Sequence, residues 1–210
     1  MPRREIVEME PAAPVPMRGM RRNADGDHRC TPRFVWEAAL TAIGRKQFDC
    51  DPATNEHSTV PAKICYDGSC PEMDGLLQPW EGNVWLNFPF SNPMPWVEKS
   101  AKELPRIRSL TVLGPNDSSV KWHQRLVRIV DAYAAWPKRF HFPLPGKAKG
   151  SGPGPIALYY VGPQSNTWMR IMRDWFDCTV YPGVTDGDRP IIIKPIRKGK
   201  SVEDVNQIEK

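Results

Sequence analysis

The sequence lacks the signals of membrane and secreted proteins. None of its 210 residues belong to an apolar stretch approaching the roughly 18 residues that a membrane-spanning helix needs. The first residues have no apolar core of the kind that a secretory signal carries. The five cysteines are an odd number and form no CxxC pair, which indicates free thiols in a reducing compartment. We therefore expect a cytoplasmic protein with no membrane segment.

The sequence also lacks internal repeats and a strong excess of one charge. Apolar residues make up 40% and charged residues 25%, which is typical of a globular domain. The net charge of +5 allows a polyanionic partner without requiring one. We expect a disordered arm over residues 1–27, one domain over residues 28–196 and a charged tail over residues 197–210.

One alternative use of the cysteines is a zinc site. His28, Cys30, Cys65 and Cys70 could supply four ligands. Their spacings do not match those of known zinc fingers, so we predict that the protein holds no metal ion.

Helical and strand patterns alternate along the domain. The first helix is predicted to open at Thr31-Pro32, where Thr31 suits the cap, and to end at Gly44. Further helices are predicted over 95–104, 121–130 and 166–176, and strands over 48–51, 84–86, 110–113, 132–136, 156–161 and 191–193. This order predicts an α/β fold, with a mostly parallel sheet and helices on both of its faces.

Some finer features complete this prediction. Phe34 and Trp175 fall at core spacing in the first and last predicted helices. The stretch that leads to Tyr66 has little pattern, and residues 67–73 are expected to form a loop. Residues 146–155 have the composition of a mobile loop, in which Lys147 and Lys149 could contact phosphate; a plain surface loop is the alternative.

The most distinctive segment is Asn87-Phe88-Pro89-Phe90, which follows the apolar strand pattern of 84–86. In open α/β sheets, ligands bind outside the carboxyl ends of strands, where this segment is expected to lie. One amide, a proline-stiffened backbone and two aromatic rings could grip a flat ring that carries an amino group. The alternative is structural: the two rings would be ordinary core, and the proline would only end the strand.

Two acidic turns precede this segment. Asp49 and Asp51 lie at the end of the predicted 48–51 strand, before Pro52 and Ala53, and Asp74 opens a turn over 74–77. Carboxylates at the end of a strand could hold hydroxyl or ammonium groups. A solvated turn, with an aspartate capping the next element, is the alternative.

Taken in order, these segments resemble the phage-type DNA N6-adenine methyltransferases. The resemblance covers roughly residues 28–163. Its matches are Thr31-Pro32, 48–53, Tyr66, 74–76, 80–82, 84–91, 96–99, 121–123, 139–142 and 155–158. The hallmark of the family is an Asn- or Asp-Pro-Pro-Tyr or -Phe tetrapeptide, in which Phe88 here replaces the first proline.

The resemblance implies a Rossmann-like methyltransferase fold that binds S-adenosylmethionine and acts on DNA, in a bacterial host cell and of phage or prophage origin. The catalytic residues it implies are Asn87, Phe88, Pro89 and Phe90. It implies that the cofactor contacts Thr31, Asp49, Asp51, Pro52, Ala53 and Asp74. Asp49 or Asp51 is expected near the methionine or ribose end, and Asp74 near the adenine. DNA contacts are expected from Ser91, Lys121, Lys147 and Lys149.

The chemistry fits these residue types. The amino lone pair of adenine is delocalised into the ring, so the nitrogen is a poor nucleophile. Two acceptors aimed at its two hydrogens would favour a tetrahedral nitrogen and stabilise the developing charge. The side-chain oxygen of Asn87 and the main-chain carbonyl of Phe88 could be these acceptors, and Phe90 offers a stacking face for a base taken out of the duplex. The methyl donor is an activated sulfonium, so the reaction needs no metal.

We therefore predict an adenine-specific DNA methyltransferase. One alternative is amino methylation of RNA or of a glutamine side chain. The other is a methyltransferase-like protein that binds nucleic acid without turnover. Nothing in the sequence indicates a particular oligomeric state.

Overall fold

The computed structural model describes residues 30–138, 142 and 154–183. The predicted N-terminal arm, the Lys147 and Lys149 loop, the 191–193 strand and the charged tail lie outside the described residues. The described part contains four α-helices, seven strands and one 3-10 turn. They are α1 (Arg33–Ala42), β1 (Phe48–Asp51), β2 (Ala62–Cys65), η1 (Pro71–Met73), β3 (Asn83–Leu86), α2 (Met94–Glu103), β4 (Ser109–Pro115), α3 (Lys121–Leu126), β5 (Ala132–Ala135), β6 (Ile156–Val161), α4 (Ser165–Phe176) and β7 (Thr179–Pro182).

The strands form one sheet in the order β2-β1-β3-β4-β6-β5-β7. β2, β1, β3 and β4 are parallel neighbours. β6 runs antiparallel to both β4 and β5, and β7 runs antiparallel to β5. Five of the seven strands, β1 to β5, therefore point the same way, and β6 and β7 point the other way. The predicted α/β fold with a mostly parallel sheet is confirmed, and it is consistent with a Rossmann-like methyltransferase.

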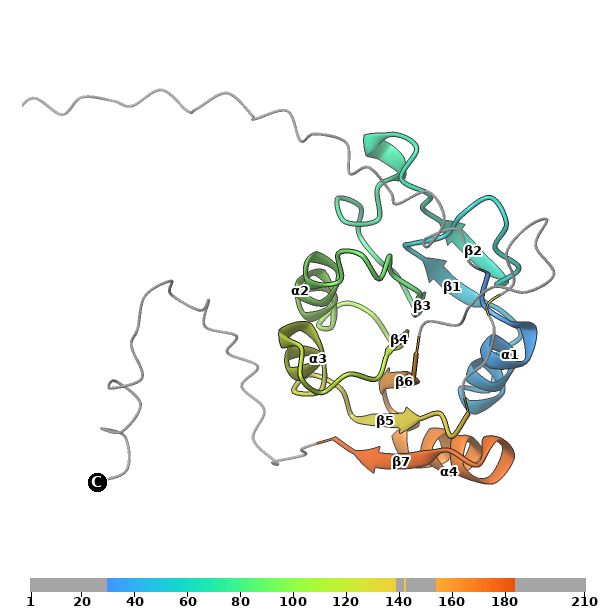
Figure 1. The fold of residues 1–210 in the computed structure, drawn as a ribbon. Coiled ribbons are helices and arrows are strands. Elements are labelled where there is room, and N and C mark those ends of the chain that lie inside the picture. The colour runs from blue at the N-terminus through green and yellow to red at the C-terminus, as the bar shows by residue number, and fades with distance from the viewer. Residues whose placement is uncertain (1–29, 139–141, 143–153, 184–210) are drawn as a thin grey trace, which may run out of the picture.

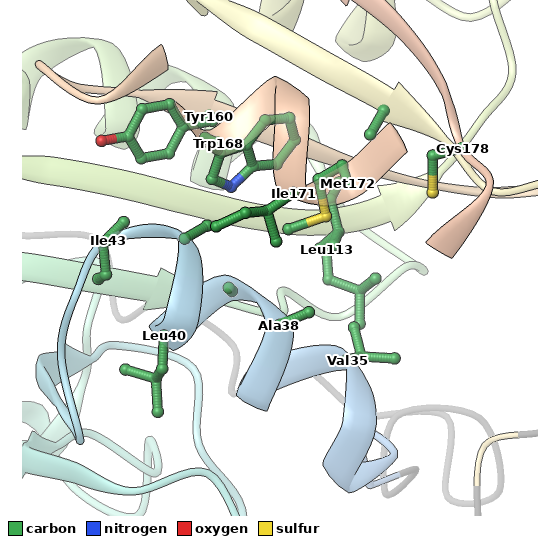
Figure 2. Packing of buried hydrophobic residues seen from close by; sticks show 14 of the residues in the cluster. Val35, Ala38, Leu40, Ile43, Leu113, Tyr160, Trp168, Ile171, Met172 and Cys178 are labelled. Carbon is green, nitrogen blue, oxygen red and sulfur yellow. The ribbon is translucent and has the colours of Figure 1, made fainter. Parts of the chain in front are cut away.

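Helices cover both faces of this sheet, with α2 and α3 on one side and α1 and α4 on the other (Figure 1). Alternate residues of a strand point to opposite faces, so Leu110 and Val112 of β4 join the α2–α3 core while Leu113 joins the other. Figure 2 shows that second core, where Val35 of α1 and Met172 of α4 lie beside Leu113. The sheet is thus buried on both faces and is a rigid base for the loops at its edges.

Two aromatic residues predicted to lie in the core are exposed instead. Phe34 keeps 44% and Trp175 keeps 64% of its surface exposed. Phe34 lies beside the buried stripe of α1 rather than in it, where its ring contacts Trp136 at 5.8 Å. Trp175 belongs to the last turn of α4. Both rings line the open groove between α1 and α4, so neither helix covers them.

Several element boundaries also differ from the sequence prediction. Pro32, not Thr31, occupies the cap position of α1, and no side chain caps this helix. α3 ends at Leu126 rather than near residue 130, because the chain tightens there into i→i−3 turns, from Arg128 to Arg125 and from Ile129 to Leu126. β2 was not predicted at all. It is an edge strand of only four residues, Ala62-Lys63-Ile64-Cys65, which is too short to show a clear alternation of apolar and polar residues.

Candidate active site

The residues of the predicted site gather at the carboxyl ends of β1 and β3. The chain goes from β1 to β2 on one side and from β3 to β4 on the other, so the order of the sheet reverses between β1 and β3. Ligands bind at such switch points in open α/β sheets. A cleft lies there. Its empty space, including the open mouth that faces solvent, is about 410 Å³. Its lining consists of Pro52, Ala53, Thr54, Asn55, Tyr66, Gly68, Asp74, Gly75, Asn87, Pro89 and Trp96.

The first wall of the cleft is the turn that leaves β1. Asp51 is only 2% exposed, and its Oδ1 accepts a hydrogen bond from the Ala53 N–H at 3.2 Å. Burial raises the pKa of this carboxyl group from 3.8 to about 7, against hydrogen bonds from Ala53 and Thr54 that lower it. Asp51 thus lies directly behind the lining residues Pro52 and Ala53. With a pKa of about 7, this carboxyl group gains or loses its proton near neutral pH.

Tyr66 extends this wall past the end of β2. Its main-chain N–H donates to the Asp51 carbonyl at 3.0 Å, and its carbonyl accepts from the Thr54 N–H at 3.1 Å. Its hydroxyl donates to the Pro79 carbonyl at 3.4 Å. Tyr66 therefore joins the β1 turn to the segment that follows Asp74, and its ring lines the cleft between them.

The second acidic turn packs directly against the first. A Cβ added at Gly75 would clash with the carbonyl oxygen of Pro52, so only glycine allows the two turns to approach this closely. Asp74 Oδ1 accepts from the Leu76 N–H at 2.9 Å and shapes the turn. The indole of Trp80 donates to the Gly75 carbonyl at 2.7 Å, which fixes the turn to the buried side of α2.

Asn87 enters the cleft from the end of β3. Its Nδ2 donates to the hydroxyl of Thr31 at 3.2 Å. Within the described residues its Oδ1 has no hydrogen-bond donor, so the oxygen is available to a ligand. This arrangement leaves an acceptor at the cleft, opposite the turn that holds Asp51.

Phe88 points away from the cleft. Its side chain is 2% exposed, and its ring meets those of Trp122 at 5.5 Å and Phe90 at 5.9 Å, both edge to face. The ring also lies against Gly114 of β4, where an added Cβ would come within 3.2 Å of it. The Phe88 ring is therefore part of the core, as the structural alternative predicted. Only the main chain of Phe88 is a candidate for catalysis.

The rest of the segment turns back over the cleft. Pro89 lines the cleft, and its carbonyl accepts from the Asn92 N–H at 3.2 Å. Phe90 is half-buried between Phe88 and Phe142, whose ring lies 6.4 Å away. Ser91 is exposed directly after it.

Asp49 lies apart from the cleft. Its Oδ2 accepts from the main chain and side chain of Asn83 at 2.9 and 2.8 Å, and its Oδ1 accepts from Lys63 at 2.7 Å. Burial opposes its ionisation, but these hydrogen bonds outweigh it and hold the pKa at about 2. Asn83 opens β3, so this carboxylate ties β1 to the beginning of its neighbour, at the opposite end from Asn87.

Five of the predicted site residues line the cleft: Pro52, Ala53, Asp74, Asn87 and Pro89. Asp51, Phe88 and Thr31 support it from behind. Lys121 is exposed at the start of α3, after the carboxyl end of β4. Lys147 and Lys149 lie outside the described residues.

The sequence reasoning did not assign Thr54, Asn55, Tyr66, Gly68, Gly75 or Trp96 to the site, although all of them line the cleft. Tyr66 and Gly68 were missed because β2 was missed; a strand there would have placed them at a carboxyl end. Trp96 was interpreted only as part of the buried face of its helix, and it is 7% exposed.

Within the described ranges, no three His, Cys, Asp or Glu side chains come together in a way that could hold a metal ion. His28, one of the four possible zinc ligands, lies outside them. Cys30 donates its thiol hydrogen to the His57 carbonyl at 2.9 Å. The helices of the described part include none that is both long and apolar enough to cross a membrane.

Comparison with known proteins points to one family. The chain is 30% identical over 109 residues to the DNA N-6-adenine-methyltransferase of Haemophilus phage HP1 (strain HP1c1), in a match that covers 51% of this chain and 60% of that protein. It is 31% identical over 94 residues to the DNA N-6-adenine-methyltransferase of Escherichia phage T1, covering 44% of this chain and 37% of that protein. The chain thus spans less than two thirds of either relative. No solved structure matches it at a significant level.

The family model gives the broader match. It extends over residues 19–146, which is more than half of the 210 residues and includes the whole cleft lining. The chain therefore belongs to the DNA N-6-adenine-methyltransferase (Dam) family.

Proposed function

We propose that this protein transfers a methyl group from S-adenosylmethionine to the N6 amino group of adenine in DNA. Membership of the Dam family supports the substrate and the reaction. The observation that carries the proposal is the position of Asn87, whose amide oxygen is available at the cleft while its amide nitrogen is held by Thr31.

The cleft suits the proposed cofactor. It lies at the switch point of the sheet, where small-molecule ligands bind in open α/β folds. The carboxyl group of Asp74 suits a hydroxyl or ammonium group, and the rings of Tyr66 and Trp96 suit an adenine, while the buried Asp51 shapes the turn behind Pro52 and Ala53. When bound, S-adenosylmethionine supplies a methyl group activated by a positively charged sulfur. Asp49 is not part of this proposal, because Lys63 and Asn83 already occupy both of its oxygens.

The substrate side depends on two acceptors. The Asn87 Oδ1 accepts a hydrogen bond from one amino hydrogen of the target adenine, and the Phe88 carbonyl accepts one from the other. Together they concentrate the lone pair on the nitrogen and stabilise the positive charge that develops there. An amide oxygen is too weak a base to keep a proton, so the proton that the nitrogen loses passes to water.

Phe90 provides a stacking surface for the target base. An adenine inside a duplex cannot reach the cleft, so the base has to leave the stack, and an aromatic face offsets part of that cost. The half-buried ring of Phe90, supported edge to face by Phe88 and Phe142, is held in one orientation. Ser91 and Lys121, both exposed at this edge of the sheet, are proposed to contact the DNA backbone. Lys147 and Lys149 remain predicted DNA contacts.

The proposal is tested by methyl transfer in vitro. The purified protein is incubated with S-adenosylmethionine labelled in its methyl group and, in separate reactions, with unmethylated duplex DNA, single-stranded DNA, RNA and a glutamine-containing protein extract. Nucleosides from the DNA are then separated. We expect labelled N6-methyldeoxyadenosine, and Asn87→Ala is expected to lack it.

Other results would point elsewhere. Label in RNA or protein, but not in DNA, would favour one of the other amino groups as the substrate. Cofactor binding by calorimetry with no label in any acceptor would indicate a binding protein without turnover. Either outcome would contradict the proposed reaction.

A further inference from the structure

We propose that Thr31 is a positioning residue, whose hydroxyl holds the side chain of Asn87 so that its amide oxygen faces the substrate. This inference rests on the proposed function, in which that oxygen accepts a hydrogen bond from the target amino group. It assigns Thr31 a role toward Asn87 rather than the cofactor contact that the family resemblance implies.

The contact joins two distant parts of the chain. Thr31 lies 56 residues before Asn87, yet its hydroxyl accepts from the Asn87 Nδ2 at 3.2 Å. Thr31 is only 5% exposed and does not line the cleft, so a ligand in the cleft does not reach its side chain directly. The hydroxyl is therefore directed at Asn87 from behind.

The hydroxyl is also not used by the helix that follows. A threonine before a helix commonly caps a free main-chain N–H, but Pro32 occupies the cap position of α1 and no side chain caps it. The N–H of Val35 is satisfied by the Pro32 carbonyl at 3.0 Å. Proline disfavours a helical conformation of the residue before it and so favours an extended one at Thr31. A buried hydroxyl with no role in the helix suits a positioning contact.

The contact matters because the two ends of an amide differ only in hydrogen bonding. The NH2 group is a donor and the oxygen an acceptor, and rotation by a half turn exchanges them at little steric cost. If the NH2 group faced the cleft, it would oppose the hydrogens of the target amino group. In this structure the Thr31 hydroxyl accepts from Nδ2, and in that arrangement the oxygen faces the cleft before the substrate arrives, so the acceptor is already oriented.

The test compares three threonine variants. Thr31→Val removes the hydroxyl and keeps the shape of the side chain, and Thr31→Ser restores a hydroxyl. Thr41→Val is the matched control, because Thr41 also belongs to this part of the chain but donates its hydroxyl hydrogen to the Glu37 carbonyl at 2.8 Å. Single-turnover rates of methyl transfer are measured at saturating DNA and cofactor, together with the Kd for S-adenosylmethionine.

Thr31→Val is expected to lower the single-turnover rate on the order of 10- to 100-fold, which is typical of a small misplacement of a reacting group. The cofactor Kd should stay within about twofold, since the cleft lining is unchanged. Thr31→Ser should recover most of the rate, and Thr41→Val should match the wild type. In an Asn87→Ala background, Thr31→Val should have no further effect on the rate, because the two residues act as a unit. A Thr31→Val rate within about threefold of the wild type would overturn the inference, as would a loss explained by weaker cofactor binding alone.

A second measurement separates this inference from the proposed function. The side-chain amide signals of Asn87 in a 15N NMR spectrum, assigned by their absence in Asn87→Ala, report the contact without any turnover. They should shift and exchange faster with water in Thr31→Val, but not in Thr41→Val. If the wild type methylates no DNA, the proposed function fails while this spectrum still decides the contact. Unchanged signals in Thr31→Val would show that Thr31 does not hold the amide.

Discussion

Phe88 shows how one residue can depart from a family pattern without changing the main-chain chemistry. Its ring fills a space formed by Phe90, Trp122 and the Cβ-free face of Gly114. Its main-chain carbonyl, the proposed second acceptor, still lies directly before Pro89. The substitution therefore moves a large side chain into the core, while the proposed acceptor belongs to the backbone that every residue shares.

Phe88→Pro is expected to destabilise the protein, because it removes a buried ring and leaves a cavity. The free energy of unfolding should fall by about 3 kcal/mol or more, as in other large-to-small core substitutions. Phe88→Leu fills more of the space and should cost less. Thermal denaturation of both variants measures the effect. An unchanged melting temperature for Phe88→Pro would mean that the ring is not part of the core.

Asn87→Ala is expected to reduce the rate of methyl transfer on the order of 100- to 1000-fold, because it removes one of two positioned acceptors. Affinity for S-adenosylmethionine should change little, because Asp74 and the rest of the cleft lining remain. Single-turnover kinetics and calorimetry measure the two effects separately. A rate within about threefold of the wild type would show that Asn87 is remote from the reacting amino group.

Asp51 is expected to make stability depend on pH. Burial raises its folded-state pKa to about 7, above its unfolded value of 3.8. Between about pH 4 and 7 the folded state keeps this proton while the unfolded state has lost it, so the free energy of unfolding falls as pH rises. Above about pH 7 both states have lost the proton, and the free energy of unfolding falls no further through this group. Asp51→Asn removes this titration. Its melting temperature should therefore rise relative to the wild type between about pH 4 and 7. A difference that is constant with pH would contradict the assignment.

At the scale of elements, the cleft is a set of turns held against one another rather than a single motif. The turn after β1, Tyr66 after β2 and the Asp74-Gly75 turn are joined by main-chain contacts. Trp80 anchors the last of these through its hydrogen bonds to the Gly75 carbonyl and to Glu103 of α2. A change at one turn is therefore expected to affect the whole cleft.

Gly75→Ala tests this coupling. The added methyl group would clash with the Pro52 carbonyl, so the two acidic turns must separate. We expect affinity for S-adenosylmethionine to fall by on the order of tenfold or more, together with a lower melting temperature. Gly44→Ala is the control: it also replaces a glycine, with a φ of 65°, but has no neighbour within 4 Å and lies away from the cleft. Equal cofactor affinity in the wild type and Gly75→Ala would show that the turns are independent.

The elements that could be predicted from the sequence are those with a clear local pattern. β6 is a continuous apolar run, β3 and β4 are mostly apolar, and α1 and α2 have apolar faces at helical spacing, so local patterns predict these elements. β2 lies at an edge and has no such pattern. The contact between Thr31 and Asn87 spans 56 residues, and the buried position of Phe88 depends on Gly114. Such contacts follow from tertiary packing, which no local spacing encodes.

At the scale of the whole molecule, the sheet brings the proposed cofactor and substrate contacts to one edge. The switch between β1 and β3 places the turn after β1, with Pro52 and Ala53, and Asn87 across one cleft. The insertion of antiparallel β6 between β4 and β5 could not be predicted, because the direction of a strand depends on how the chain returns to the sheet. The net charge of +5 allows a polyanionic partner for the molecule as a whole.

Duplex affinity is expected to fall steeply with salt, because the protein releases counterions from DNA phosphates. Lys121→Ala should reduce the slope of log affinity against log salt by about one, uniformly across sequences. Lys46→Ala should leave the slope unchanged, because Lys46 lies just before β1, at the amino edge of the sheet. Fluorescence anisotropy over a range of salt concentrations measures both slopes. An unchanged slope for Lys121→Ala would mean that Lys121 does not contact phosphate.

The most direct test of the proposed function is a nucleoside analysis of DNA from living cells. The protein is expressed in a bacterial strain without its own adenine methyltransferase, and the genomic DNA is digested and measured by mass spectrometry. We predict N6-methyldeoxyadenosine in cells that express the wild type, and none above background with Asn87→Ala at the same protein level. Absence of the modified nucleoside with soluble, folded wild-type protein, or an equal amount with Asn87→Ala, would contradict the proposed reaction at this cleft.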